Sequence, residues 1–177
     1  LLRAERRECP RFPCNTVCSQ FDADLLARGA AGARFRVIAN GVDTRFFRIE
    51  REPRAAPSVV FAGRLDQYSN RDGIHWFCSQ VWPRVRAAVP GARLDILGNN
   101  PAAELRALAA SDETIRLHGF VDDIRPWFAA AHAAIAPIRD GGGTRIKVLD
   151  AMAMGMPVVA TSIALEGLEV VPGKELL

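Results

Sequence analysis

The sequence lacks both the long apolar runs of membrane proteins and the strong charge imbalance of nucleic-acid-binding proteins. No apolar run approaches the roughly 18 residues that indicate a membrane-spanning helix. The chain has 23 Lys and Arg residues against 20 Asp and Glu residues, so its formal net charge is only +3. Because this excess is small and both signs are mixed along most of the chain, any preference for anions must be local. We expect no nucleic-acid partner.

Cysteines are few, and their spacing fits neither a metal site nor a disulfide framework. Cys9, Cys14 and Cys18 lie close together, but no Cys-x2-Cys pair or histidine follows to complete a zinc set. We therefore expect no bound metal and a cytoplasmic protein, with peripheral association with the inner membrane as an alternative. The chain begins at Leu1 rather than Met and ends in "VPGKELL", which we interpret as a piece of a longer protein.

The sequence does have a hydrophobic content of 49%, and from about residue 57 its apolar runs alternate with helical patterns. The runs predicted to be strands are 58–63, 93–98, 114–119, 133–138 and 157–161, with 168–171 as a candidate sixth. The helical patterns are 72–89, 101–110, 121–131 and about 144–154. This alternation predicts an α/β fold with a Rossmann-like parallel sheet covered by helices on both faces. Most loop glycines then fall at the carboxyl edge of the sheet, where such folds bind ligands.

The first part of the chain has a different pattern. Residues 15–30 are typical of a short strand followed by a helix, and "FRVIANGVD" (35–43) of a strand and a turn. The charged, proline-bearing stretch 48–57 has the composition of a linker. We predict that residues 1–47 contain the end of a preceding domain and the interdomain linker. Residues 48–177 then form the Rossmann-like domain, truncated at its C-terminus.

The stretch "DGGGTRIKVLDAMAMGMPVV" (140–159) leads three glycines into an amphipathic helix that we expect to begin near Thr144. Arg145 and Lys147 fall in its first turn, where a cation is unfavourable by about 0.3–1 kcal/mol unless an anion lies beside it. Lys147 and Asp150 share a face of this helix, so free amides, a cation and a carboxylate line one edge. We hypothesise a nucleotide site, with phosphates at the helix end and ribose at Asp150. The alternative is that Thr144 caps the helix and Lys147 pairs with Asp150.

Two familiar nucleotide motifs are absent. The glycines do not complete G-x-G-x-x-G, because position 146 is isoleucine, and no G-x4-G-K-[ST] occurs. Ordinary dinucleotide and NTPase interpretations are therefore disfavoured. A second cation, Arg64, follows the strand-end Gly63 in "FAGRL", so it also belongs at the carboxyl edge. An exposed loop arginine is the alternative interpretation.

In combination, four segments resemble the donor half of a family 4 glycosyltransferase, one of the group 1 glycosyltransferases with the GT-B fold. These segments are "VIANGVDTRFF", "VVFAGRLD", "LHGFVDDI" and "PIRDGGGTRIKVLDAMAMGMPVVAT". The resemblance covers roughly residues 15–177, and the stretches around "YSNRDGIHWF" and "GGGTRIK" also resemble a bacterial subgroup associated with exopolysaccharide synthesis. It implies that residues 48–177 form a nucleotide-sugar-binding domain, the C-terminal half of a two-domain enzyme.

The resemblance further implies transfer of a hexosyl group from a UDP- or GDP-sugar to a hydroxyl of a glycan or lipid-linked acceptor, with retention and without a metal or other cofactor. The departing diphosphate would be stabilised by Arg64, Arg145 and Lys147, as catalytic residues. The residues implied in donor binding are Gly63, Phe120, Val121, Gly142, Gly143, Thr144 and Asp150. Phe120 and Val121 would pack against the base, and Asp150 would bind the ribose.

The sequence departs from the family pattern at three positions. Of the two glutamates eight residues apart that the family usually shows, the first is Gly142 and the second is Asp150. The lysine that usually follows the arginine equivalent to Arg64 is missing. These departures keep open a non-catalytic, degenerate nucleotide-binding domain, and a nucleotide-sugar epimerase on the same scaffold is a further alternative. We expect the fragment alone to be inactive, because half of the cleft belongs to the preceding domain.

Overall fold

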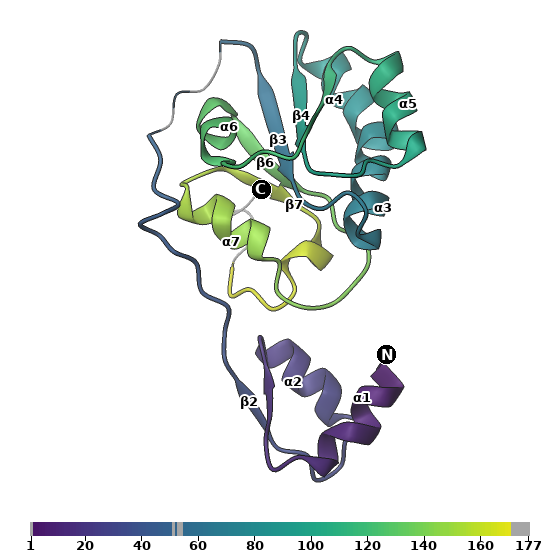
Figure 1. Ribbon diagram of the computed structural model, residues 1–177, viewed down its shortest axis with the longest axis vertical. Helices are drawn as coiled ribbons and strands as arrows, with labels where there is room; N and C mark the ends of the chain where they lie inside the picture. Colours follow the sequence, from purple (N-terminus) through teal and green to yellow (C-terminus); the bar gives the residue numbers. More distant parts are fainter. Residues whose placement is uncertain (1, 51, 53–54, 171–177) are drawn as a thin grey trace.

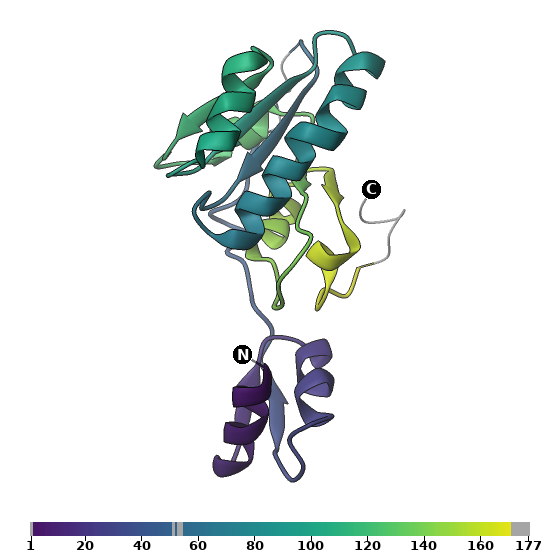
Figure 2. The ribbon, with the colours of Figure 1, turned by 90° about the vertical axis from the view of Figure 1, so that its right-hand side faces the viewer.

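The computed structural model describes residues 2–50, 52 and 55–170. A larger α/β unit and a smaller N-terminal unit are joined by one extended segment (Figures 1 and 2). The larger unit begins at β3 and contains every residue that the sequence assigns to a site.

The larger unit is built on a five-stranded, wholly parallel sheet with the strand order β5-β4-β3-β6-β7. Its strands are β3 (Ser58–Ala62), β4 (Arg93–Leu97), β5 (Ile115–Gly119), β6 (Ala133–Ala136) and β7 (Val158–Ala160). Val60 at the centre of β3 pairs with Asp95 on one side and Ala134 on the other. The predicted α/β fold and its five strands are confirmed. The expected sixth strand is wrong for residues 168–170, which form no strand, and residue 171 lies outside the described residues.

Helices cover both faces of this sheet, as predicted (Figure 1). One face carries α3 (Tyr68–Trp76), a π-helical segment (Phe77–Val81), α4 (Trp82–Ala88) and α5 (Ala103–Ser111). The other carries α6 (Arg125–Ala130) and α7 (Ile146–Ala153), and a short 3-10 helix (Ser162–Leu165) follows β7.

The four predicted helices differ from the structure in their bounds, and the one expected over 101–110 is α5, Ala103–Ser111. The helix expected from residue 72 begins at Tyr68. It changes to a π-helical turn over Phe77–Val81, because Pro83 has no amide hydrogen to continue the α-helical hydrogen bonds. The helix expected over 121–131 is confined to α6, because the Asp123 carboxylate accepts the Arg125 amide (2.9 Å) and fixes a turn there. The helix expected near Thr144 begins at Ile146.

Two apolar clusters hold the layers together, one on each face of the sheet. Successive residues of β3 point to opposite faces, so Val60 packs under α6 and α7 whereas Phe61 packs under α3, α4 and α5. Both side chains have no exposed surface, and burying each contributes about 1.5–3 kcal/mol. Helix α3 lies so close to the chain after β6 that a Cβ on Gly73 would sit 2.2 Å from the Pro137 carbonyl oxygen. This fit fixes α3 beside the end of β6.

The smaller unit is a strand–helix–strand motif preceded by a helix. It consists of α1 (Leu2–Glu8), a 3-10 turn (Cys9–Arg11), β1 (Asn15–Val17), α2 (Gln20–Ala27) and β2 (Phe35–Val37). The two strands pair in parallel, with Thr16 opposite Arg36, and the Ser19 hydroxyl caps α2 by accepting the Asp22 amide (3.1 Å). The strand, helix and strand expected in this region are therefore confirmed. The division of the chain at residue 47 stays a prediction.

Candidate functional site

The site candidates lie at the point where the strand order reverses. The chain runs outward from β3 through β4 to β5, and then returns to the other side of β3 to form β6 and β7. The loops that follow β3 and β6 therefore run in opposite directions, and the carboxyl edge between them, called the crevice below, is the place where open α/β sheets bind ligands. Gly63 and Arg64 follow β3, and the glycine loop, defined as residues 141–144, follows β6.

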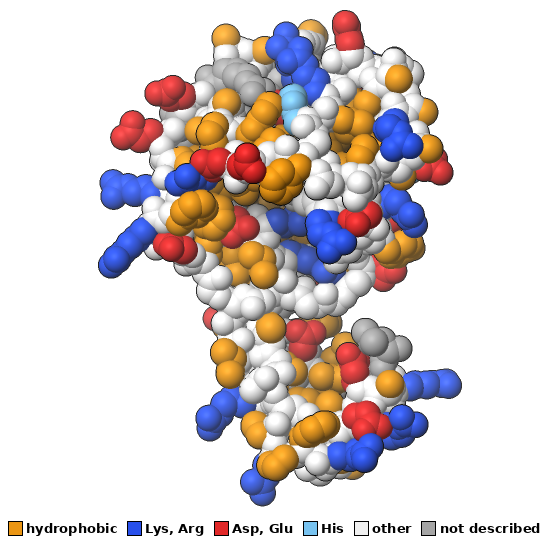
Figure 3. All heavy atoms as spheres, in the orientation of Figure 1, with side chains coloured by type: hydrophobic (Ala, Val, Ile, Leu, Met, Phe, Trp, Pro, Cys, Tyr) orange, Lys and Arg blue, Asp and Glu red, His pale blue; other side chains and the backbone are white. Residues whose placement is uncertain are grey.

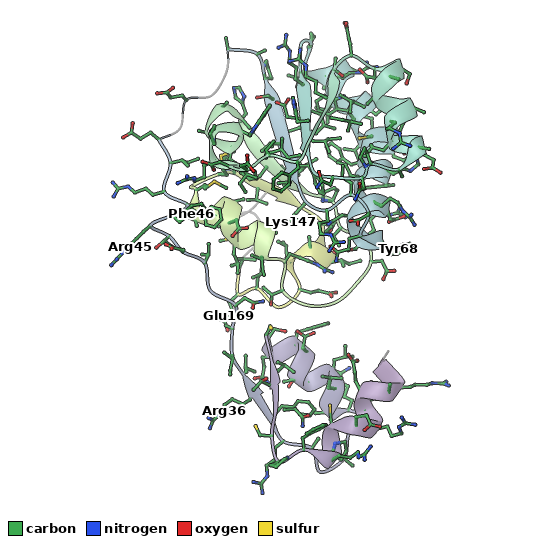
Figure 4. The ribbon with its side chains drawn as sticks, in the orientation of Figure 1. Arg36, Arg45, Phe46, Tyr68, Lys147 and Glu169 are labelled. Carbon is green, nitrogen blue, oxygen red and sulfur yellow. The ribbon has the colours of Figure 1, made fainter. Side chains whose placement is uncertain are left out.

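Lys147 reaches across this crevice from the first turn of α7. Its Nζ donates a hydrogen bond to Oδ1 of Asn70 (2.6 Å) and lies 4.3 Å from the centre of the Phe61 ring. A Cβ on Gly63 would sit 2.7 Å from the same Nζ, so any other residue at position 63 would displace the ammonium group from this place. Figure 4 shows Lys147 between α7 and α3. The ammonium group is therefore placed directly beside the carboxyl end of β3.

The charge of Lys147 is poorly compensated. No carboxylate within the described part of the chain forms an ion pair with it, so the alternative in which Lys147 pairs with Asp150 is wrong. Burial, reinforced by the positive charge of Arg145, lowers the pKa of Lys147 to about 7. The side chain is thus about half protonated at neutral pH. An anion bound beside it would raise this pKa.

Arg145 occupies the N-cap of α7 and closes the glycine loop. Its Nη2 donates to the Gly141 carbonyl (2.5 Å), while its Nε is buried without a hydrogen-bond partner in the described structure. Gly141 and Gly143 have φ of 102° and 84°, which favour glycine, whereas Gly142 has no such requirement and faces open space. No side chain caps α7: the Thr144 hydroxyl is buried and makes no hydrogen bond to the described residues, so the capping role considered for it is wrong.

Arg64 is exposed at the tip of the loop after β3. Its Nε and Nη2 donate to the two carboxylate oxygens of Asp66 at 3.2 and 3.0 Å. The hydrogen bonds raise the pKa of Arg64 and lower that of Asp66, so both groups are charged at neutral pH. The pair leaves the Arg64 guanidinium at the surface, where another anion could compete with Asp66.

A cavity of about 510 Å³ opens beside Arg64, at the ends of β3, β4 and β5. Its lining includes four of the expected site residues, Gly63, Arg64, Phe120 and Val121. Phe120 is 68% exposed, and it follows the strand-end Gly119. Figure 3 shows basic side chains gathered around the hollowed middle of this face. The volume is within the range of about 300–1,000 Å³ that is typical of small-molecule sites.

The remaining expected residues are not brought into that cavity. Gly142 and Gly143 line a larger space of about 1,020 Å³ between the two units, together with Val17 and Phe21 of the smaller one. Thr144 lines a third space of about 580 Å³.

Asp150 lies one turn after Lys147 and lines none of these three cavities. It is half-buried and has no side-chain hydrogen bond or ion pair to the described residues, and burial raises its pKa. A ribose-binding role for Asp150 stays a prediction.

One participant was missed by sequence reasoning, namely Asn70. It was interpreted as part of a loop, because the helix was expected to begin two residues later. In the structure Asn70 is in the first turn of α3 on the side that also carries Gly73 and Ile74, and it is only 4% exposed. The sequence did contain a signal: Asn70 precedes the apolar Ile74 by four residues, so a helix that starts earlier places both on the same buried face.

Two kinds of feature are absent from the described residues. Within them, no helix combines the length and apolar character needed to cross a bilayer. The same residues contain no group of three or more His, Cys, Asp or Glu side chains placed to hold a metal ion.

Comparison with known proteins places the chain in a family. Residues 56–176 match the family model "Glycosyl transferases group 1". An uncharacterised 44.6 kDa protein from the cps region of Klebsiella pneumoniae is 32% identical over 127 residues, which are 68% of this chain and 33% of that protein. A phosphatidyl-myo-inositol mannosyltransferase of Propionibacterium freudenreichii subsp. shermanii is 26% identical over 172 residues, which are 92% of this chain and 42% of the relative. The chain thus spans less than half the length of these curated relatives.

Solved structures show the same fold. Sucrose-phosphate synthase from Thermosynechococcus elongatus superposes with a TM-score of 0.78 at 20% identity, over 97% of this chain and 46% of that chain. Anabaena HepE, solved with UDP and glucose, gives a TM-score of 0.72 at 17% identity, over 91% of this chain and 48% of its own. Both sequence and fold lead to one assignment: this chain belongs to the group 1 glycosyl transferases and has the α/β fold of GT-B glycosyltransferases.

Proposed function

We propose that this chain is the donor-binding half of a glycosyltransferase that transfers a hexosyl group from a UDP- or GDP-sugar to an acceptor hydroxyl. The observation that carries the proposal is Lys147, a cation without a carboxylate partner among the described residues, held at the reversal point of the sheet beside Gly63. Such a placement costs free energy unless an anion enters the crevice. The solved relative HepE contains UDP, a ligand that supplies such an anion.

In the proposed mechanism the diphosphate lies between the loops after β3 and β6. Lys147 and Arg64 approach it from two sides, and the uncapped amides at the start of α7, with Gly142, Gly143 and Thr144 before them, face it from a third. As the glycosidic bond breaks, negative charge grows on the terminal phosphate, and these groups together with Arg145 stabilise it. Charge-assisted hydrogen bonds of this kind contribute about 1.5–3 kcal/mol each.

The cavity beside Arg64 is proposed to hold the nucleoside. Phe120 and Val121 form its wall and would pack against the base. Asp150, which does not line this cavity, is proposed to accept the ribose hydroxyls. Retention of anomeric configuration, independence of metal ions, a cytoplasmic location and a role in exopolysaccharide synthesis complete the proposal. Its glycan or lipid-linked acceptor would be bound chiefly by the preceding domain.

Calorimetric titration of the chain with UDP, GDP and ADP tests the donor site. We expect one of the three to bind, and Lys147→Met to weaken that binding at least tenfold, because one charge-assisted hydrogen bond is lost. Arg84→Met, on the exposed surface of α4, removes a cation without touching the crevice and serves as the matched control. No binding by a folded chain would instead support the degenerate domain. Turnover of a nucleotide-sugar without an acceptor would support the epimerase.

A further inference from the structure

Asn70 makes the contacts that fix Lys147 in the crevice. Its Oδ1 accepts the Lys147 ammonium at 2.6 Å, across 77 residues of sequence. Its Nδ2 donates to the Arg64 carbonyl (2.9 Å) and to Oε1 of Gln67 (3.2 Å). One buried amide therefore joins the start of α3, the loop after β3 and the first turn of α7.

The orientation of this amide is determined by its partners. Both hydrogens of Nδ2 are directed at oxygen acceptors, and a flipped amide would place an N–H donor against the ammonium of Lys147. Asn70 is 4% exposed, so water cannot easily replace a missing partner. A Cβ on Gly63 would lie 3.1 Å from Nδ2 and 2.7 Å from the lysine Nζ. Gly63 therefore packs against both Asn70 and Lys147.

We propose that Asn70 is a positioning residue: it holds Lys147 beside the end of β3 with a neutral acceptor, so that the positive charge stays available for the phosphates of the donor. The choice of an amide is the essential feature. A carboxylate at this position would form an ion pair with Lys147 and neutralise it, whereas the amide oxygen accepts a hydrogen bond and adds no charge. The role of Asn70 in donor binding rests on the proposed function, whereas its positioning of Lys147 through the hydrogen bond does not.

The test is the titration of Lys147 in the absence of any ligand. The chain has only two lysines, Lys147 and Lys174, so ¹³C-lysine NMR gives two ε-carbon signals that the Lys147→Arg variant assigns. In Asn70→Asp we expect the midpoint of Lys147 to rise by about 1–3 pH units, because a carboxylate replaces the amide within hydrogen-bond distance. UDP, or whichever nucleotide the chain binds, should then bind at least tenfold more weakly at pH 7.

Gln67→Glu is the matched control, since it makes the same amide-to-carboxylate change at an exposed residue that contacts Asn70 rather than Lys147. Its effect on the midpoint should be clearly smaller than that of Asn70→Asp, because the new charge is exposed and lies farther from the ammonium. If Asn70→Asp does not fold, Asn70→Ala replaces it: a shift of one unit or more in either direction supports the proposal, because Lys147 has lost its acceptor or left its place.

An unchanged midpoint in the folded variants would overturn the positioning role. A shifted midpoint with unweakened nucleotide binding would overturn the link to the phosphates. Failure of the unmodified chain to bind any nucleotide would contradict the proposed function, and the ligand-free titration would still decide whether Asn70 holds Lys147.

Discussion

Nucleotide binding by this chain is expected to weaken as the pH rises above about 7, because the phosphates need Lys147 in its charged form. Burial and the neighbouring Arg145 lower the pKa of this lysine to about 7, far from the ordinary value of 10.5. A bound diphosphate raises that pKa again, since an opposite charge favours the protonated amine. Binding above pH 7 must therefore be accompanied by uptake of a proton.

The magnitude follows from the fraction of charged lysine. This fraction is about one half at pH 7, one tenth at pH 8 and one hundredth at pH 9. The dissociation constant should therefore rise about fivefold between pH 7 and 8 and about tenfold between pH 8 and 9, which approaches about 1.4 kcal/mol per pH unit. The ligand itself does not produce this slope, because the second ionisation of a phosphate has a pKa near 6 and is nearly complete above pH 7.

Calorimetry between pH 6.5 and 9 measures this slope directly. Repeating the titration at pH 8 in buffers of different ionisation enthalpy counts the protons taken up, and we expect close to one. Lys147→Met should bind weakly at every pH and lose the slope, whereas Arg84→Met should keep it. An affinity that does not change between pH 7 and 9, or a slope that persists in Lys147→Met, would refute the reasoning.

Two further predictions concern the stability of the chain without a ligand. The unfolded chain binds a proton at Lys147 up to about pH 10.5 while the folded chain releases it near 7, so stability should rise between these values by up to about 1.4 kcal/mol per pH unit. Lys147→Met should remove that rise in urea denaturation series, and an equal rise in the variant would contradict the assignment. Gly143→Ala should cost about 1–2 kcal/mol, because φ there is 84°, whereas Gly142→Ala, with open space around it, should stay within about 0.5 kcal/mol. Equal losses in thermal unfolding would show that the loop is not held in this conformation.

Local sequence patterns determined the elements of the fold. Apolar runs such as 58–63 and 93–98 are short and end at a glycine, which favours buried strands, and the helical patterns between them favour a parallel sheet. The glycines after the fourth of these strands, with Arg145 and Lys147 behind them, likewise predicted an anion site from local pattern, and that site stays a prediction. A helix end, its glycines and its charges lie within a few residues of one another.

Tertiary structure alone decided how these pieces meet. The contact between Lys147 and Asn70 joins residues 77 positions apart, and it exists because β6 returns to the side of β3 and brings α7 against α3. No local pattern contains that information, because the partner of a buried side chain is chosen by strand order and packing. For the same reason the sequence suggested a pairing of Lys147 with Asp150 and a cap at Thr144, both reasonable along one helix. In the folded chain Lys147 instead turns away from its own helix towards the end of the neighbouring strand, and its low pKa results from the burial that this placement imposes.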